Sequence, residues 1–235
     1  MKKYLIIALG ALLCFAVGCA GPESPAPASE PAPEPTPEPA PEPAQETQED
    51  VPPPDIITGT IEMDDGGLIT FELYPDIAPQ SVRNFVYLAR QGFYDSLTFH
   101  RIVNATISNS LFVIQGGCPD GTGRGNPGYS IFGEFEANGF GNNLSHTRGV
   151  ISMARAADYN SAGSQFFILH DDSLFLDGNY AGFGMVTSGM DVVDRLAETP
   201  VLDDNGAVAP ENMPVIKSIT IDGNFAYPEP DKLAR

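Results

Sequence analysis

Cysteine, tryptophan and basic residues are scarce in this chain of 235 residues. It has three cysteines and no tryptophan. Cys14 and Cys19 belong to the N-terminal apolar run, so Cys118 is the only cysteine of the remaining chain. A disulfide within that part is therefore excluded, and its stability must come from a hydrophobic core. The three histidines have no cysteine or histidine at ligand spacing, so we expect no metal site and no cofactor.

Positive charge is also scarce. Twelve lysines and arginines stand against 31 aspartates and glutamates, which gives a formal net charge of −19. Binding to the phosphate backbone of nucleic acids requires a basic face, so nucleic acid is excluded as a partner. An acidic surface favours solubility and says little about the fold.

Long hydrophobic runs are absent as well. The longest run, Leu5–Val17, has thirteen residues and follows the basic segment Met1–Lys3. About 20 apolar residues are needed to span a bilayer, so residues 1–18 are predicted to be a signal peptide. The sequence Ala16–Cys19 resembles a bacterial lipobox, which implies cleavage before Cys19, a lipid on its thiol and an extracytoplasmic, membrane-anchored protein. The alternative is an ordinary secretory signal in which the cysteine is incidental.

Residues 19–54 are rich in proline and glutamate. Proline occupies every second position from Pro31 to Pro43, and Gly21–Pro54 contains eight acidic residues and no basic one. Such a segment cannot bury apolar surface and has few N–H donors for a helix or sheet. We expect an extended, disordered spacer between the membrane and a domain. A PxxP-type ligand for a partner domain is the alternative.

Short strand-like segments follow, with only two helical patterns among them. The turn Asp64–Gly67 favours a hairpin between the first two strands. Many short strands with two separated helices predict a closed antiparallel barrel, and not a parallel α/β sheet. The expected strands are 56–63, 68–74, 99–103, 111–117, 149–155, 164–170, 181–187 and 215–221. The expected helices are Ala78–Gln91 and Ser188–Ala197, the latter with Ser188 as N-cap.

Two familiar catalytic or binding patterns are excluded. The letters of Gly123-x-Gly125-x-x-Gly128 match a dinucleotide fingerprint, but Pro127 interrupts them and a strand-like segment follows where a helix is required. No Ser-His-Asp grouping and no glycine-flanked nucleophilic serine is recognisable in the sequence. Hydrolysis through a serine nucleophile is therefore not expected.

The stretch Phe99–Gln115, together with Gly163–Phe167, carries the strongest signal. It places an arginine and two glutamines among phenylalanines on predicted strands, although an unpaired buried charge is costly. The ordered motifs FHRIV, FVIQGG, GTG, MARA, GSQFFI and FLDG resemble the cyclophilin-type peptidyl-prolyl isomerases over about residues 56–223. The resemblance implies a mostly β domain over residues 55–227, a closed eight-stranded antiparallel barrel capped by two α-helices, and a C-terminal tail over 228–235.

The resemblance also implies the site residues. The catalytic positions correspond to Arg101, Phe112 and Gln115. The substrate-binding positions correspond to Val113, Gly121, Thr122, Ala154, Arg155, Ala156, Gln165, Phe167, Phe175, Leu176 and Tyr180. The chain departs from the family pattern where Val113 replaces the more usual Met, Arg155 an Asn, and Phe175 a Trp, and where Tyr180 stands at the His of the animal enzymes. His100 alternates to the opposite strand face from Arg101 and is interpreted as structural.

The expected function is therefore prolyl isomerisation of proline-containing polypeptides by a monomer that assists the folding of exported proteins. Rotation of a prolyl bond needs an apolar pocket for the ring and a donor near the prolyl nitrogen, and no nucleophile. Two rivals remain: a module that binds proline-containing segments without catalysis, and a chaperone in which the polar insert Asn104–Ser110 matters more than the pocket. We expect the insert to be a surface loop at the rim of the site.

Overall fold

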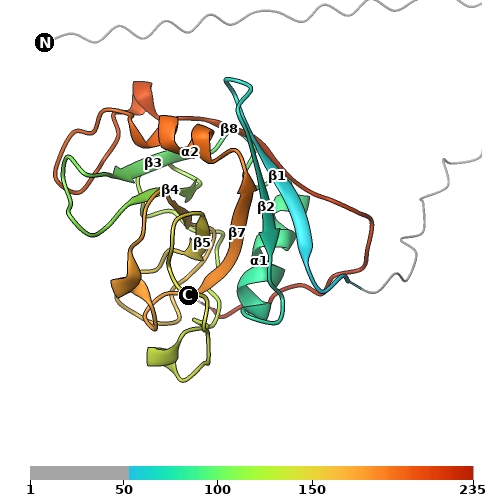
Figure 1. Cartoon of the computed structure of the whole chain (residues 1–235). Helices are drawn as coiled ribbons and strands as arrows, with labels where there is room; N and C mark the ends of the chain where they lie inside the picture. Colours follow the sequence, from blue (N-terminus) through green and yellow to red (C-terminus); the bar gives the residue numbers. More distant parts are fainter. Residues whose placement is uncertain (1–52, 235) are drawn as a thin grey trace, which may run out of the picture. The chain divides into compact units, whose positions relative to one another are not determined.

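A computed structural model of the chain describes residues 53–234, and the predicted signal peptide, Cys19 and almost all of the spacer lie outside this range. Eight strands and two α-helices follow one another (Figure 1). The strands are β1 (Ile57–Met63), β2 (Leu68–Leu73), β3 (Thr98–Val103), β4 (Val113–Cys118), β5 (Val150–Met153), β6 (Phe166–Leu169), β7 (Gly182–Ser188) and β8 (Ile216–Ile221). The helices are α1 (Pro79–Arg90) and α2 (Met190–Ala197). Every predicted strand and helix is thus present, with small differences at the ends.

The strands form one antiparallel sheet in the order β3-β4-β6-β5-β7-β2-β1-β8. The edge strands β3 and β8 approach each other only near Thr98, which forms an isolated bridge with Val215. The sheet is therefore curled but open, a half-barrel, and the predicted closure of the barrel is not confirmed. The expected mostly β architecture and the hairpin between β1 and β2 are confirmed.

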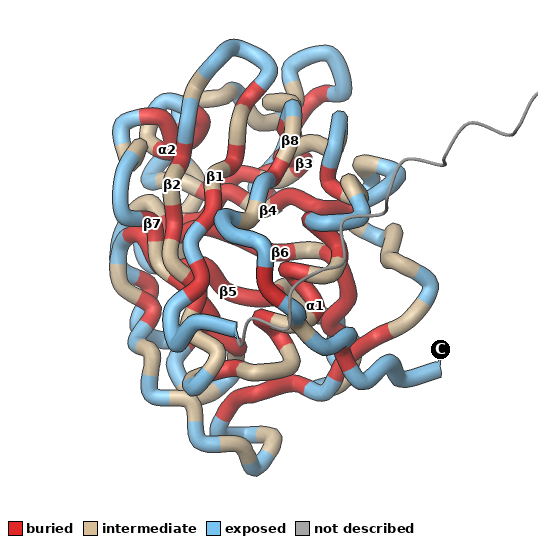
Figure 2. Tube along the Cα trace, turned by 90° about the vertical axis from the view of Figure 1, so that its right-hand side faces the viewer, coloured by how far each residue is buried: buried red, intermediate tan, exposed pale blue. Residues whose placement is uncertain are grey.

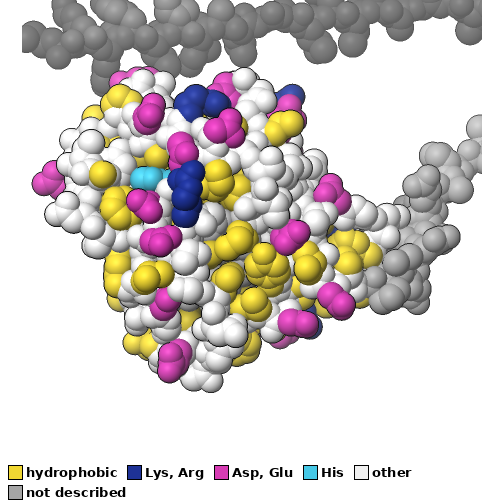
Figure 3. Space-filling model, viewed as in Figure 1, with side chains coloured by type: hydrophobic (Ala, Val, Ile, Leu, Met, Phe, Trp, Pro, Cys, Tyr) yellow, Lys and Arg dark blue, Asp and Glu magenta, His cyan; other side chains and the backbone are white. Residues whose placement is uncertain are grey.

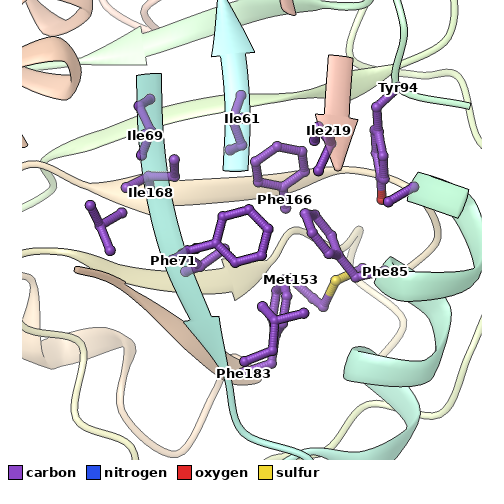
Figure 4. Close-up of a cluster of buried hydrophobic side chains, with 14 of the residues drawn as sticks. Ile61, Ile69, Phe71, Phe85, Tyr94, Met153, Phe166, Ile168, Phe183 and Ile219 are labelled. Atoms are coloured by element: carbon purple, nitrogen blue, oxygen red, sulfur yellow. The ribbon is translucent and has the colours of Figure 1, made fainter. Parts of the chain in front are cut away.

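The hollow side of the curled sheet is filled by a large apolar core. Figure 2 shows the strands as mostly buried and the connecting loops as mostly exposed. Aromatic rings dominate the centre, where Phe85 of α1 lies 5.8 Å from Phe71 and 5.2 Å from Phe166 between ring centroids (Figure 4). Tyr94 and Phe183 complete this contact group. Such a core supplies the stability that the domain cannot obtain from disulfides.

The start of α1 is capped by a distant residue. Pro79 occupies the first turn, as predicted, but the N-cap residue Ala78 has no side-chain acceptor. The buried carboxylate of Glu134 accepts hydrogen bonds from the backbone N–H groups of Gln80 and Ser81 at 2.7 and 2.8 Å. Burial raises the pKa of Glu134. The hydrogen bonds that its oxygens accept from the N–H groups of Gln80 and Ser81 and from the Ser81 hydroxyl lower the pKa and so oppose that effect.

The start of α2 corrects one prediction. Ser188 is the last residue of β7, and Gly189 is the N-cap of the helix with a φ of 87°. Its backbone lies against the carbonyl oxygen of Leu68, which a Cβ at this position would approach to 2.1 Å. A serine cap is therefore impossible here, because both the positive φ and the close approach require glycine.

The insert between β3 and β4 is a polar loop, as expected, and it is tied to its surroundings at both ends. Asn104 donates a hydrogen bond from its amide nitrogen to the carbonyl of Ala197 at the end of α2. Ser108 accepts hydrogen bonds from the backbone N–H groups of Ser110 and Leu111. These contacts fix the direction in which the chain re-enters β4 after the loop.

The last described residues lie against the domain. Leu233 pairs with Ser130 through two backbone hydrogen bonds of 3.1 and 2.8 Å. Asp231 donates its backbone N–H to the side chain of Gln80 at the start of α1. The segment expected as a C-terminal tail is thus attached to the folded domain over its described part.

Candidate active site

Arg101 and Gln115 are direct partners on neighbouring antiparallel strands. The register of β3 against β4 shifts between Phe99 and Arg101, so Phe99 and His100 are both buried while Arg101 faces its partner. Such a bulge re-aims the side chains that follow it. The guanidinium Nη1 of Arg101 donates to Oε1 of Gln115 at 3.1 Å, and Nε donates to the carbonyl of Asn205 at 2.8 Å.

Nη2 is the nitrogen of Arg101 that remains available. Within residues 53–234 it makes no hydrogen bond. Burial lowers the pKa of Arg101, but an arginine remains protonated near neutral pH. The strand pairing therefore presents a cationic donor in a fixed orientation.

Hydrogen bonds between two carboxamide side chains fix the orientation of Gln115. Gln115 Nε2 donates to Oε1 of Gln165 at 3.0 Å. Gln165 Nε2 in turn donates to the carbonyl oxygens of Gly123 and Gly125 at 3.0 and 2.9 Å. The predicted pair of glutamines thus connects Arg101 to the glycine-rich loop, and each side chain is held by its neighbour.

An apolar cavity of about 160 Å³ lies beside Arg101. One water occupies about 30 Å³, so this space is large enough for a five-membered ring. Its floor is Phe167, which is 5% exposed, and Leu176 closes it from the next segment of the chain. The lining of this apolar cavity consists of Arg101, Leu111, Val113, Gln115, Ala154, Arg155, Phe167, Leu176 and Tyr180.

Eight of these nine residues were predicted as site residues from the sequence. The ninth, Leu111, was missed, although alternation along a strand places residues 111, 113 and 115 on one face. Phe112 has the opposite orientation and does not line the cavity. Its ring packs edge-on against His170 with centroids 5.7 Å apart, and its backbone N–H donates to the hydroxyl of Ser173.

Phe167 is supported by a polar chain that runs from the buried Ser152 and His146 to the exposed Asp177. The ring of His146 stacks on Phe167 with centroids 6.2 Å apart. His146 Nδ1 lies 2.8 Å from Oδ1 of Asp177, and Nε2 lies 2.9 Å from Oγ of Ser152. The structure thus assembles a Ser-His-Asp grouping that the sequence did not reveal, because its members are 6 and 31 residues apart.

This grouping is not a nucleophilic triad. Ser152 is completely buried and lines neither cavity of the site, so its hydroxyl cannot reach a substrate. Burial lowers the pKa of His146, and its hydrogen bond to Asp177 opposes that effect. The imidazole is therefore neutral near pH 7 and acts as a rigid support for the cavity floor.

A second, larger cavity of about 320 Å³ adjoins the apolar one and shares Gln115, Ala154 and Arg155 with it. Its lining is mostly polar or glycine, and we call it the polar cavity. It consists of Gln115, Gly123, Arg124, Gly125, Asn126, Ala154, Arg155, Ala156, Ser161, Gly163, Ser164 and Gln165. Of the predicted substrate-binding residues that follow β5, Ala154 and Arg155 thus belong to the wall of both cavities, and Ala156 lines only the polar one.

Arg155 is held rigidly in this wall. Its Nε and Nη2 donate to the carbonyl of Asn179 at 3.0 and 2.9 Å, and Nη1 donates to the carbonyl of Ala156. Its guanidinium also lies 4.6 Å from the ring centroid of Tyr180 and 5.0 Å from that of Tyr159. Stacking of this kind suits arginine better than lysine, because the guanidinium is planar and weakly hydrated.

Three predicted substrate-binding residues lie outside both cavities. Gly121 has a φ of 67° in the loop after β4, and the hydroxyl of Thr122 donates to Asp120 at 2.7 Å. Phe175 is 56% exposed, as is its neighbour Leu174 at 53%. These residues can meet only a ligand that extends beyond the two cavities.

Within residues 53–234, no group of three acidic, histidine or cysteine side chains could hold a metal ion. Cys118 is a free, buried cysteine whose sulfur lies 2.9 Å from Oδ1 of Asp120. In the same part of the chain, no helix is long and apolar enough to cross a membrane.

The chain is similar to known isomerases in sequence and in structure. Residues 58–221 match the family described as cyclophilin type peptidyl-prolyl cis-trans isomerase/CLD. The peptidyl-prolyl cis-trans isomerase B of Bacillus subtilis is 46% identical over 147 residues, which cover 63% of this chain and 95% of that protein. A peptidyl-prolyl cis-trans isomerase of Helicobacter pylori is 43% identical, over 58% of this chain and 78% of that protein.

A solved structure agrees. The cyclophilin type isomerase of Cryptosporidium parvum, crystallised in the presence of the dipeptide Ala-Pro, matches with a TM-score of 0.60 and 30% identity. The match covers 71% of this chain and 99% of that one. The chain thus belongs to the cyclophilin family and is a peptidyl-prolyl cis-trans isomerase.

Proposed function

We propose that the apolar cavity binds the proline ring of a substrate and that Arg101 stabilises the twisted state of the preceding peptide bond. A planar prolyl bond resists rotation by about 18–20 kcal/mol, because resonance must be lost. In the twisted state the nitrogen regains its lone pair and becomes basic. A donor that binds this state better than either planar isomer accelerates rotation in both directions.

The observation that carries this proposal is the free donor at the cavity. Arg101 Nη2 is unpaired in the described part of the chain, while Nε and Nη1 are anchored to Asn205 and Gln115. Two anchored nitrogens hold the third in place, so little orientation is lost when the twisted state forms. Gln115 is anchored in turn through Gln165.

The direct test is exchange spectroscopy on a short peptide with one X-Pro bond and the purified protein. We expect exchange between the cis and trans signals to rise in proportion to the enzyme concentration. Exchange at the uncatalysed rate, with a lifetime of tens to hundreds of seconds, would refute the proposal.

We propose further that the enzyme acts outside the cytoplasm, tethered to the cell membrane, on exported proteins that contain proline. The support is the order of segments in the sequence: a signal-like start, Cys19, a proline- and glutamate-rich stretch, and then the isomerase domain. A single acyl chain binds a membrane only marginally, so stable tethering needs more than one chain.

Replacement of the proposed lipid site tests the tether. Cys19→Ser should either release the protein from the membrane fraction or leave the precursor uncut. Cys118→Ser serves as the matched control and should leave fractionation unchanged. A mature N-terminus without lipid at any position other than residue 19, found by mass spectrometry, would overturn the tether but not the isomerase activity.

A further inference from the structure

The two cavities of the site are lined by arginines and by no acidic residue. Arg101 and Arg155 line the apolar cavity, and Arg124 and Arg155 line the polar one. None of the three forms an ion pair with a carboxylate within residues 53–234. Four basic residues elsewhere in that range do: Arg148, Arg195, Lys217 and Lys232. The three arginines of the site, like Arg83 and Arg90 elsewhere, thus carry positive charge that no carboxylate of the described residues pairs.

Three acidic residues near the site accept hydrogen bonds from groups other than its arginines. Asp120 accepts hydrogen bonds from the backbone and hydroxyl of Thr122, which with Cys118 lower its pKa to about 2. Asp158 accepts a hydrogen bond from the backbone of Asn160. Asp203, whose charge acts on Arg101, accepts two backbone N–H groups of its own loop. Within residues 53–234 none of these carboxylates forms an ion pair with Arg101, Arg124 or Arg155.

Arg124 and Arg155 differ in a useful way. Arg155 is fixed by carbonyl groups and aromatic rings and forms part of the wall. Arg124 is exposed in the glycine-rich loop, and its guanidinium makes no hydrogen bond within the described residues. Its forked donors are free to meet a carboxylate in the polar cavity.

We propose that the polar cavity selects substrates with a carboxylate side chain two residues away from the proline. This proposal rests on the proposed placement of the proline ring in the apolar cavity. Side chains on an extended peptide alternate faces, so the residue two positions away points to the same wall as the proline. Ala154 and Arg155 line both cavities, so a peptide that follows this wall from the apolar cavity brings that side chain to Arg124.

The overall charge of the protein predicts the opposite preference. Figure 3 shows acidic side chains spread over the face in view, with few basic ones between them. A field of this sign, from a chain with a net charge of −19, attracts basic peptides and repels acidic ones. The local arginines and the global charge therefore make contrary predictions, and the sign of the preference distinguishes them.

The experiment measures kcat/KM on peptides with one Ala-Pro bond and a single Glu, Gln or Lys placed two residues before or two residues after the proline. At low ionic strength we expect the Glu peptide to exceed the Lys peptide by about tenfold at one of the two positions. High salt should reduce the ratio to about twofold, because exposed charges are screened within about 3 Å at 1 M salt.

Variants at Arg124 and Arg195 show which arginine causes the preference for Glu, since Arg124→Gln and Arg195→Gln remove the same charge. Arg124→Gln should bring the ratio close to one, and Arg124→Glu should invert it. Arg195→Gln, whose exposed partner is Asp65 on the hairpin, should leave the ratio as in the parent protein. Melting temperatures of all variants show whether each is folded.

The outcomes separate the two proposals. Turnover of the all-alanine reference peptide without a preference for Glu at either position, or with a preference for Lys, overturns the acidic selectivity and leaves the isomerase function standing. A preference for Glu that survives Arg124→Gln also overturns it. Absence of turnover on every peptide refutes the proposed mechanism itself.

Discussion

Replacement of Arg101 by alanine is the strongest test of the assigned mechanism. The variant removes the guanidinium donor at the apolar cavity and leaves the ring-binding side chains Val113, Phe167 and Leu176 in place. Substrate should therefore still bind through its proline, while the twisted state loses its stabilising donor. The loss is expected mainly in kcat, because the donor acts on the twisted state more than on the planar isomers.

The magnitude follows from comparable donors. Removal of one hydrogen-bond donor from an enclosed oxyanion site costs about 2.7–4 kcal/mol, or about 10²–10³-fold in rate. The site here is open to water and Arg101 is only partly buried, so the lower end, about 100-fold, is expected. The two hydrogen bonds to Asn205 and Gln115 are also lost, and their loss should cost about 1 kcal/mol of folding stability.

Exchange spectroscopy gives the rates, and a thermal melt gives the stability of the same sample. A cost of about 1 kcal/mol corresponds to a drop of about 2–4 °C in melting temperature for a domain of this size. Arg101→Lys is the matched variant: it keeps the charge but cannot hold Nε and Nη1 contacts together, so an intermediate rate is expected. A folded Arg101→Ala protein within threefold of the parent kcat/KM would refute the mechanism.

Four further predictions follow from other contacts. Burial holds the pKa values of His146 and His100 below about 6.5, so the unfolded chain binds more protons at these residues than the folded one. The free energy of unfolding, measured by denaturant titration, should therefore be at its full value above about pH 6.5 and fall as the pH drops below it. Glu134→Ala should cost about 2 kcal/mol in urea unfolding, because α1 loses its cap, and an unchanged midpoint would contradict the capping role. The resemblance associates cyclosporin binding with a tryptophan at position 175, so Phe175→Trp should tighten this binding by about five- to 150-fold in a calorimetric titration. Turnover of short peptides should change little, because they need not reach this exposed side chain. Deletion of Asn104–Ser110 with a Pro-Gly bridge should preserve turnover of short peptides and change the rates on long protein substrates, and equal rates on both substrates would make the loop neutral.

The sequence was sufficient for the parts of the fold that depend on local patterns. Alternating apolar residues predicted all eight strands. The helical spacing of Val82, Phe85, Val86 and Ala89 predicted α1 and the face of it that is buried. The N-cap of α2 was predicted wrongly, because a serine is normally the better N-cap, and only the contact between Gly189 and Leu68 reverses that preference.

The parts that could not be predicted are contacts between segments far apart in the chain. Glu134 caps a helix 53 and 54 residues away, and Asn205 anchors a guanidinium 104 residues away. No pattern in a single sequence predicts these long-range hydrogen bonds, since Glu134 and Asn205 are each an ordinary polar residue in a loop. Leu111 is a different case: simple alternation from Val113 places it on the cavity face, next to the predicted residues.

Strand β3 combines several features that work against stability. Its register shifts next to His100, and neither ring nitrogen of this buried histidine has a hydrogen-bond partner among residues 53–234. The next residue, Arg101, is partly buried and has no carboxylate partner in the described part of the chain. A buried polar group without a partner costs about 1–3 kcal/mol, and an apolar residue at position 100 would avoid that cost.

The place of Arg101 at the apolar cavity accounts for the two features that concern this residue. The bulge turns Arg101 toward Gln115, and the absence of a carboxylate keeps one guanidinium nitrogen free at the cavity. A carboxylate placed next to Arg101 would stabilise the charge in the resting protein and occupy the donor that the twisted bond requires. Stability and catalysis therefore make opposite demands on this strand, and the strand in this protein meets those of catalysis while the aromatic core around Phe85 supplies the stability.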